Sequence, residues 1–184
     1  MQGLTDMTLT PELLRANSDV RGMLWAFDFL VTDNREFGPV WFDTAPLHPF
    51  EIVAQRSSGC IYALIGPQRH VLLATSEGQA GIVAANLGEC LELVIAYPYW
   101  QDVLRLGKGD LNAMRQVLRE RGDRFEEQAL DDNPEIEALR PLLRSQLRLA
   151  PSGDPLERLH RAVEELGAGL IIGDHDGNRL QRLV

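Results

Sequence analysis

Two cysteines and four histidines are among the side chains of this sequence that could serve as a nucleophile, a base or a metal ligand. Cys60 stands at the start of one apolar run and Cys90 lies inside another. A cysteine nucleophile needs a neighbouring base that a third group orients, and His70 is the candidate base. No such third group is evident, so we interpret both cysteines as small buried apolar side chains and expect no catalytic residue. A small hydrolase that depends on Cys60 or His70 is the alternative function.

The spacing of the histidines does not predict a metal site. Zinc ligands come as closely spaced pairs of cysteine or histidine, and the sequence has no such pair. We expect His160 to lie on the inner face of a helix, where a backbone carbonyl satisfies its ring, and His175 to lie in a solvated turn. The histidines, none of which we expect to bind a metal, are His48, His70, His160 and His175.

Three loops resemble ligand-binding motifs but fail on spacing. Residues 174–178 lack the ligand order and the closing Glu of a calcium loop, so their Asp-Gly pair predicts a hairpin turn. Gly107-Lys108 lacks the earlier Gly and the following hydroxyl of a phosphate-binding loop. The glycines at 78 and 81 lack the strand before and the helix after that define a dinucleotide site. We therefore expect no cofactor.

Acidic residues after residue 130 form the candidate partner-binding group, which consists of Asp131, Asp132, Glu135 and Glu137. Such a group is typical of a solvated loop, and it also attracts a basic partner. The whole chain carries 18 basic and 27 acidic residues, a net charge of −9 at pH 7. A nucleic-acid binder needs a surplus of basic residues, so the composition argues against that class and leaves a protein as the expected partner.

Aromatic side chains gather in Tyr97-Pro98-Tyr99-Trp100, at the end of a predicted helix. We interpret this run as closing the core, and an interface hot spot is the alternative, because large aromatic side chains serve both purposes.

The elements that must position these residues begin with two helices. Thr10-Pro11 predicts a short helix, and apolar residues at helical spacing predict a second one from Ser18 to Val31. Short apolar runs separated by turn residues then predict an antiparallel meander. Its strands are expected at Pro49–Gln55, Cys60–Ile65 and His70–Thr75, with a further edge strand at Ile82–Ala84.

The second half of the chain reads as mainly helical. Asn86, Asp110 and Asp154 are expected to cap three helices, the first of which ends before Pro98. A break is expected at residues 131–134, and the helical pattern that resumes after it is interrupted by Pro141. A terminal hairpin is expected at residues 170–184. The fold class is therefore α+β, an antiparallel meander packed by helices, with a mainly helical C-terminal part and a terminal β-hairpin.

The middle of the chain resembles the SUKH superfamily, which includes bacterial immunity proteins and a eukaryotic cell-wall-assembly regulator. The resemblance lies in the order strand, Gly turn, strand with an aromatic residue, third strand and capped helix. The segments that carry it are Phe50–Gln55, Ser57–Leu64, Val71–Leu73, Ser76–Gly78 and Ala84–Leu91. Asn86 stands where the family has Ser, and Cys90 where it has Phe.

The resemblance covers residues 40–106 and implies helices packed around an antiparallel sheet. Many bacterial members of the family neutralise a toxin by direct binding, so it also implies an immunity protein with a basic toxin domain as partner. An acidic inhibitor suits that role, because toxins that bind nucleic acid are basic. A scaffold or regulatory subunit without a toxin partner is the second alternative. We expect one SUKH-like domain over 1–184, with a helical extension and hairpin over 107–184.

We expect a cytoplasmic protein that neither crosses a membrane nor depends on disulfides. The first six residues have no signal-peptide pattern, and the apolar run Met23–Val31 is interrupted by Asp28. A membrane span needs about 20 apolar residues, which is far longer than this run. Two cysteines are too few for a disulfide framework in a chain of 184 residues. The oligomeric state is left open by the sequence.

Overall fold

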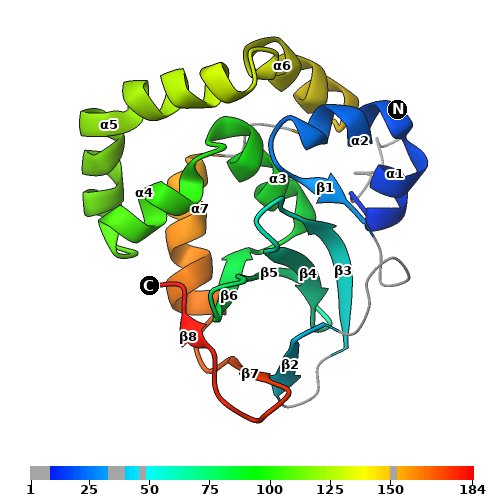
Figure 1. The fold of residues 1–184 in the computed structure, drawn as a ribbon, viewed down its shortest axis with the longest axis vertical. Coiled ribbons are helices and arrows are strands. Elements are labelled where there is room, and N and C mark those ends of the chain that lie inside the picture. Colours follow the sequence, from blue (N-terminus) through cyan, green and yellow to red (C-terminus); the bar gives the residue numbers. More distant parts are fainter. Residues whose placement is uncertain (1–8, 33–39, 46–48, 150–152) are drawn as a thin grey trace, which may run out of the picture.

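The computed structural model describes residues 9–32, 40–45, 49–149 and 153–184. It has the expected α+β architecture, in which one face of an antiparallel sheet carries helices and the other face carries a separate pair of strands (Figure 1). The strands are β1 Leu30–Val31, β2 Phe42–Ala45, β3 Phe50–Gln55, β4 Ile61–Ile65, β5 His70–Ala74, β6 Gln79–Ala84, β7 Ile171–Asp174 and β8 Gln181–Arg182. The helices are α1 Pro11–Ala16, α2 Ser18–Trp25, α3 Leu87–Ala96, α4 Trp100–Gly107, α5 Leu111–Asp132, α6 Ile136–Gln146 and α7 Pro155–Arg161, which continues into a π-helical turn η1, Ala162–Leu166.

The main sheet has the strand order β1-β3-β4-β5-β6-β8. The predicted meander is confirmed, since β3, β4, β5 and β6 pair in sequence with antiparallel register. The prediction of β6 as an edge strand over Ile82–Ala84 is wrong, because β6 begins at Gln79 and β8 pairs with its outer side. The β3–β4 turn depends on Gly59, whose φ of 87° lies in the left-handed region that side chains disfavour. Gly59 donates its N–H to the carbonyl of Arg56, and this bond closes the turn.

Both faces of the meander are buried, which explains why its strands are apolar without alternation. On β4 the side chains of Tyr62 and Leu64 join the core beneath the helices, whereas Ile61 and Ile65 join a second core on the opposite face. Phe42 of β2 is fully buried in that second core. The β2–β7 pair therefore covers the face of the sheet that the helices leave open.

The second helix is shorter than its apolar pattern predicts. It ends at Trp25, and residues 30–31 instead pair with β3 as strand β1. The cause is Asp28, which adopts a φ of 54° and so breaks the helix. Its carboxylate accepts hydrogen bonds from the backbone N–H of Ser57 at 2.7 Å and from Nε of Arg56 at 2.8 Å. These contacts with the β3–β4 turn replace the helical hydrogen bonds that the segment gives up.

The terminal turn forms as expected, but its two arms join different sheets. Asp174 receives N–H groups from Asp176 and Asn178, which closes the turn. Before the turn, β7 pairs with β2, and after it β8 pairs in parallel with β6. A single bridge, between Gly173 and Arg179, links the two arms outside the named strands.

The three predicted helix caps are confirmed. The side chains of Asn86, Asp110 and Asp154 accept the N–H groups of Glu89, Ala113 and Leu156, respectively. α5 is the longest described helix, although Met114 is its one fully buried residue. It changes direction partway along and forms, with α6, an arch above α3 and α4 (Figure 1).

The predicted interruption at Pro141 does not occur, because α6 runs through it from Ile136 to Gln146. Pro141 removes the hydrogen bond to the carbonyl of Glu137, one helical turn earlier. The burial of Ile136 and Leu143 on the inner face of α6 offsets that loss.

Glu92 on α3 is a buried carboxylate that is poorly compensated. It is 4% exposed, its Oε2 lies 3.8 Å from Nε of Arg144, and its Oε1 has no hydrogen-bond partner among the described residues. We expect Glu92→Met to raise the free energy of unfolding by about 1 kcal/mol, because a buried charge with one distant partner is often less stable than an apolar residue. Urea unfolding measures the change.

Glu89→Met is the matched control, one turn earlier on the same helix. Glu89 accepts the N–H of Ala85 at 3.3 Å, so its loss should lower stability. A Glu92→Met variant that is also less stable than the parent would contradict the assignment of Glu92 as an unfavourable buried charge.

Candidate functional site

A surface groove crosses the molecule from the loop after β5 to the C-terminal half of α5. It consists of two adjoining hollows with volumes of about 490 Å³ and 820 Å³. The smaller, which we name the sheet half, is lined by Cys60, Thr75, Glu77 and Gln101 among others. The larger, the helix half, is lined by Trp25, Phe125, Ala129, Asp132 and Ile136 among others. Both halves share Asp28, Arg56, Pro98, Tyr99 and Asp102, so they form one continuous depression.

The helix half has an aromatic lining. Trp25, at the end of α2, is 69% exposed, although large aromatic side chains are usually well buried. The rings of Tyr99 and Phe125 lie 5.3 Å apart in the same hollow. A hollow of this kind offers apolar area that a partner can bury.

A network of polar contacts holds Tyr99 and α5 in place. Arg140 of α6 binds both carboxylate oxygens of Glu126 on α5, and its Nε donates to the carbonyl of Ile95 at 3.0 Å. The pKa of Tyr99 is raised to about 12. Burial is the largest cause, and the negative charge of Glu126 and a hydrogen bond with its carboxylate raise this pKa further. Arg140, Glu126 and the carbonyl of Ile95, which we call the Arg140 network, therefore link α6, α5 and α3 and hold Tyr99 in the aromatic lining.

The two basic residues of the groove are already paired with acidic residues. Arg56 binds Asp28 at 2.8 Å and also contacts Oε1 of Gln101. Arg105, on the wall of the sheet half, binds Asp102 at 2.8 Å. These pairs leave little positive charge free for an anionic ligand.

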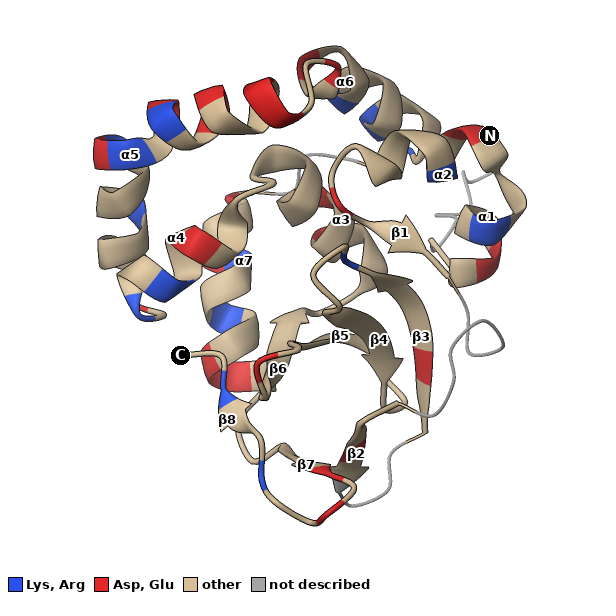
Figure 2. Ribbon diagram, viewed as in Figure 1, with Lys and Arg blue, Asp and Glu red and all other residues tan. Residues whose placement is uncertain are grey.

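Each end of the groove carries an exposed acidic residue that is not neutralised. Glu77 in the sheet half and Asp132 in the helix half make no ion pair with any residue in the described ranges. Asp132 also lies in the last turn of α5, which contains no basic residue, and a helix ends with a partial negative charge. Acidic residues are dense where α5 approaches α6 (Figure 2).

The four acidic residues predicted as a partner-binding group lie together around the junction of α5 and α6, and all are exposed. Asp132 lines the groove, whereas Asp131, Glu135 and Glu137 do not. The structure does not test whether any of them binds a partner, and the group stays a prediction.

Cys60 and His70 are not brought together. Ile65 pairs with His70 and Ile61 with Ala74, which places Cys60 and His70 at opposite ends of the β4–β5 pair. At a rise of about 3.3 Å per residue the two are about 16 Å apart along the strand. His70 Nδ1 instead lies 3.0 Å from the carbonyl of Ala85, and Ser58 donates its hydroxyl to Sγ of Cys60.

Both thiols are shielded in the fold. Cys90 is fully buried, and burial raises the pKa of its thiol, while Cys60 is 6% exposed. We expect Ellman's reagent at neutral pH to modify neither thiol rapidly in the native protein and to modify both in denaturant. A Cys60→Ser variant assigns the two reactions. Rapid modification of native Cys60 would contradict this expectation and favour the hydrolase alternative.

His160 and His175 each contact a backbone carbonyl. His160 is satisfied as predicted, since its Nδ1 lies 2.8 Å from the carbonyl of Gly109. His175 is exposed in the terminal turn and its Nε2 contacts the carbonyl of Val40, whereas His48 lies outside the described residues. Throughout the described ranges, no three His, Cys, Asp or Glu side chains are grouped to hold a metal ion.

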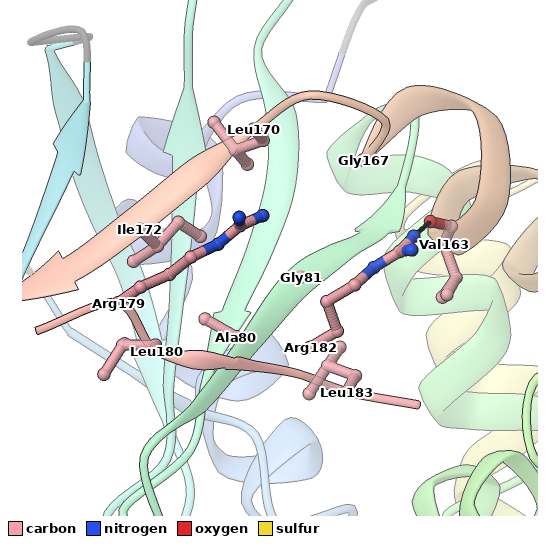
Figure 3. Close-up of a pocket in the computed structure, with 10 residues that line it drawn as sticks. All are labelled: Ala80, Gly81, Val163, Gly167, Leu170, Ile172, Arg179, Leu180, Arg182 and Leu183. Atoms are coloured by element: carbon pink, nitrogen blue, oxygen red, sulfur yellow. Dashed lines mark hydrogen bonds between the residues drawn. The ribbon is translucent and has the colours of Figure 1, made fainter.

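A small cavity between η1, β6 and β8 carries two arginines on its wall (Figure 3). Arg182 points toward the carbonyl of Val163, at 3.5 Å, and the remaining wall includes Leu170 and Ile172. Its volume is about 30 Å³, which is room for a water molecule and not for a substrate. We therefore assign no function to it. Among the described helices, none combines the length and apolar character that a membrane crossing requires.

The sequence predicted part of the groove but not Trp25, an exposed large apolar residue of its lining. The aromatic residues at 97–100 have different positions in the fold. Trp100 is 1% exposed and closes the core, whereas Tyr99 is half-buried and lines the groove. Trp25 lies within the helix predicted from Ser18 to Val31, but off the apolar stripe that predicts that helix. The signal for its exposure was its position away from the apolar stripe, although Phe29 shares that position and is fully buried.

Comparisons of the chain with family models, with curated proteins and with solved structures each find no match.

Proposed function

We propose that this chain is a non-enzymatic protein-binding domain and that it acts in the bacterial cytoplasm as an immunity protein, neutralising a cognate toxin by direct binding. The observation that carries the proposal is the groove, in which an exposed Trp25 lines the same hollow as the Tyr99–Phe125 pair and the unneutralised Asp132. Exposed aromatic side chains in a surface hollow are typical anchors of protein interfaces, and an unneutralised carboxylate beside them favours a basic partner.

The charge of the chain supports a basic partner. The groove is acidic beyond its internal ion pairs, and the whole chain carries a net charge of −9. A toxin that acts on nucleic acid needs basic residues to bind phosphate. An acidic inhibitor therefore attracts such a toxin from a distance and can obstruct its substrate channel without any chemistry of its own. The SUKH resemblance of residues 40–106 points in the same direction.

The proposal is tested by producing the chain together with the product of the adjacent gene and measuring growth. We expect that product to arrest growth alone, the chain to relieve the arrest, and Trp25→Asp to abolish the relief. Leu142→Asp is the matched control, because Leu142 is 51% exposed on α6 and lies outside the groove. A neighbour that is not toxic, or arrest that the chain does not relieve, would overturn the immunity role.

A scaffold or regulatory subunit differs from an immunity protein in its partner and not in its surface. If the adjacent gene product binds the chain without arresting growth, the result favours a scaffold or regulatory subunit over an immunity protein. Loss of that binding in Trp25→Asp would still assign the groove as the interface.

A further inference from the structure

We infer that the groove receives an extended segment of the partner that carries a basic residue at each end and apolar side chains between them. The inference rests on the proposed function and specifies the chemistry of what binds. It follows from the distribution of charge along the groove and from the shape of its two halves.

The acidic residues at the two ends of the groove favour basic residues at the two ends of the bound segment. Glu77 at one end and Asp132 at the other are exposed and make no ion pair with the residues that the structure describes. Between them, the charges of Arg56 and Arg105 are compensated by Asp28 and Asp102. A segment with basic residues spaced to reach both ends gains two attractive contacts, and an acidic segment meets repulsion at both.

The apolar lining in the middle of the groove favours apolar side chains in the middle of the bound segment. Pro98 and Tyr99 are shared by the two hollows, and Trp25 and Phe125 extend this apolar surface in the helix half. The two hollows have volumes of about 490 Å³ and 820 Å³ and are partly open to solvent. A continuous open depression of this kind can receive an extended segment whose side chains enter its two hollows.

The helix half favours arginine over lysine at its end. The Tyr99 and Phe125 rings and the exposed indole of Trp25 line the same hollow as Asp132. A guanidinium group can stack on an aromatic face while it binds a carboxylate with two parallel hydrogen bonds, whereas an ammonium group is a compact charge. Of the two rings that line the sheet half, Trp100 is buried and Tyr99 is half-buried, and Trp25 and Phe125 do not reach this half, so either basic residue suits Glu77.

The experiment uses the full chain and an array of short synthetic peptides in which two arginines flank leucine and tryptophan at increasing separation. Peptides with glutamate or citrulline in place of each arginine are the probes of charge. We expect the doubly basic peptides to bind best at one separation, and we expect each glutamate replacement to weaken binding about tenfold.

Variants of the chain locate the contact. Glu77→Lys and Asp132→Lys should each weaken the best peptide about tenfold, and Trp25→Ala should weaken it about 30-fold. Glu127→Lys is the matched control, because Glu127 is exposed on the same helix as Asp132 and does not line the groove. Asp132→Lys should regain affinity for the peptide that carries glutamate at one end.

Two results would overturn the inference. One is an array without preference for doubly basic peptides, and the other is a Glu127→Lys effect as large as that of Glu77→Lys and Asp132→Lys. The relief of growth arrest is measured without these peptides, so the immunity role can stand when the inference fails. Conversely, strong peptide binding in a chain that relieves no arrest would uphold the inference and remove the immunity role.

Discussion

Replacement of Gly107 by alanine is expected to lower the free energy of unfolding by about 3 kcal/mol, the upper part of the range for overpacking. Gly107 ends α4 where α5 crosses it most closely. An added Cβ would lie 2.5 Å from Cγ of Met114, 2.7 Å from its backbone nitrogen and 2.8 Å from its Cα. Two of these are backbone atoms, and Met114 is fully buried, so a side-chain rotation cannot relieve the overlap.

Urea unfolding followed by circular dichroism measures this change. Gly22→Ala is the matched control, because Gly22 lies inside α2 and an added Cβ has no heavy atom within 4 Å apart from its chain neighbours and the adjoining helix backbone. The control should gain about 0.5–1 kcal/mol, since alanine favours a helix more than glycine does. A Gly107→Ala variant as stable as the parent would show that α4 and α5 do not approach as closely as described.

Replacement of Arg140 by methionine is expected to cost about 2–3 kcal/mol and to weaken partner binding as well. The substitution removes the donors that Arg140 supplies to the carboxylate of Glu126 and to the carbonyl of Ile95. Arg140 and Glu126 are 18% and 29% exposed, so water compensates only part of the loss. Tyr99 depends on the same carboxylate, and we therefore expect the aromatic lining of the groove to lose its fixed position.

A double-mutant cycle with Glu126→Met isolates this pair. The double variant should be more stable than the sum of the single losses predicts, because removing both partners leaves no unpaired charge. Arg119→Met is the control, since Arg119 is exposed on α5. Equal losses at Arg140 and Arg119, or strictly additive losses in the cycle, would contradict the role of the Arg140 network.

The parts of the fold that were predictable depend on local physics. Asn86, Asp110 and Asp154 each cap the helix that follows them, since a short polar side chain at that position satisfies free N–H groups. The meander was predictable because apolar runs alternate with turn residues such as Gly59, whose conformation few other residues adopt.

The parts that were not predictable depend on contacts between distant segments. The apolar spacing from Val20 to Val31 indicates one helix, but Asp28 bonds with the β3–β4 turn and divides it. Phe42 carries no local signal that its strand pairs with residues 171–174. Likewise, Pro141 is a helix breaker by local rules, and the burial of its neighbours on α6 overrides that preference.

The candidate site shows the same division. Composition predicted an acidic surface, and the structure places one of the four predicted residues, Asp132, in the groove. Glu77 and Trp25 were not predicted, because a groove exists only where α2, the loop after β5 and α5 meet in space. A single sequence gives the charge of such a surface but not its location.

The pairing of β2 with β7 has a consequence for the order of folding. β2 lies in the first quarter of the chain and β7 near its end, and the whole meander and helices α3 to α7 lie between them in sequence. Closing so long a loop is slow, whereas the hairpins of the meander form from near neighbours. An early intermediate would therefore leave the Ile52 and Leu72 side of the sheet open to other molecules until β7 arrives. Refolding yield should accordingly fall as protein concentration rises, through association at this stage.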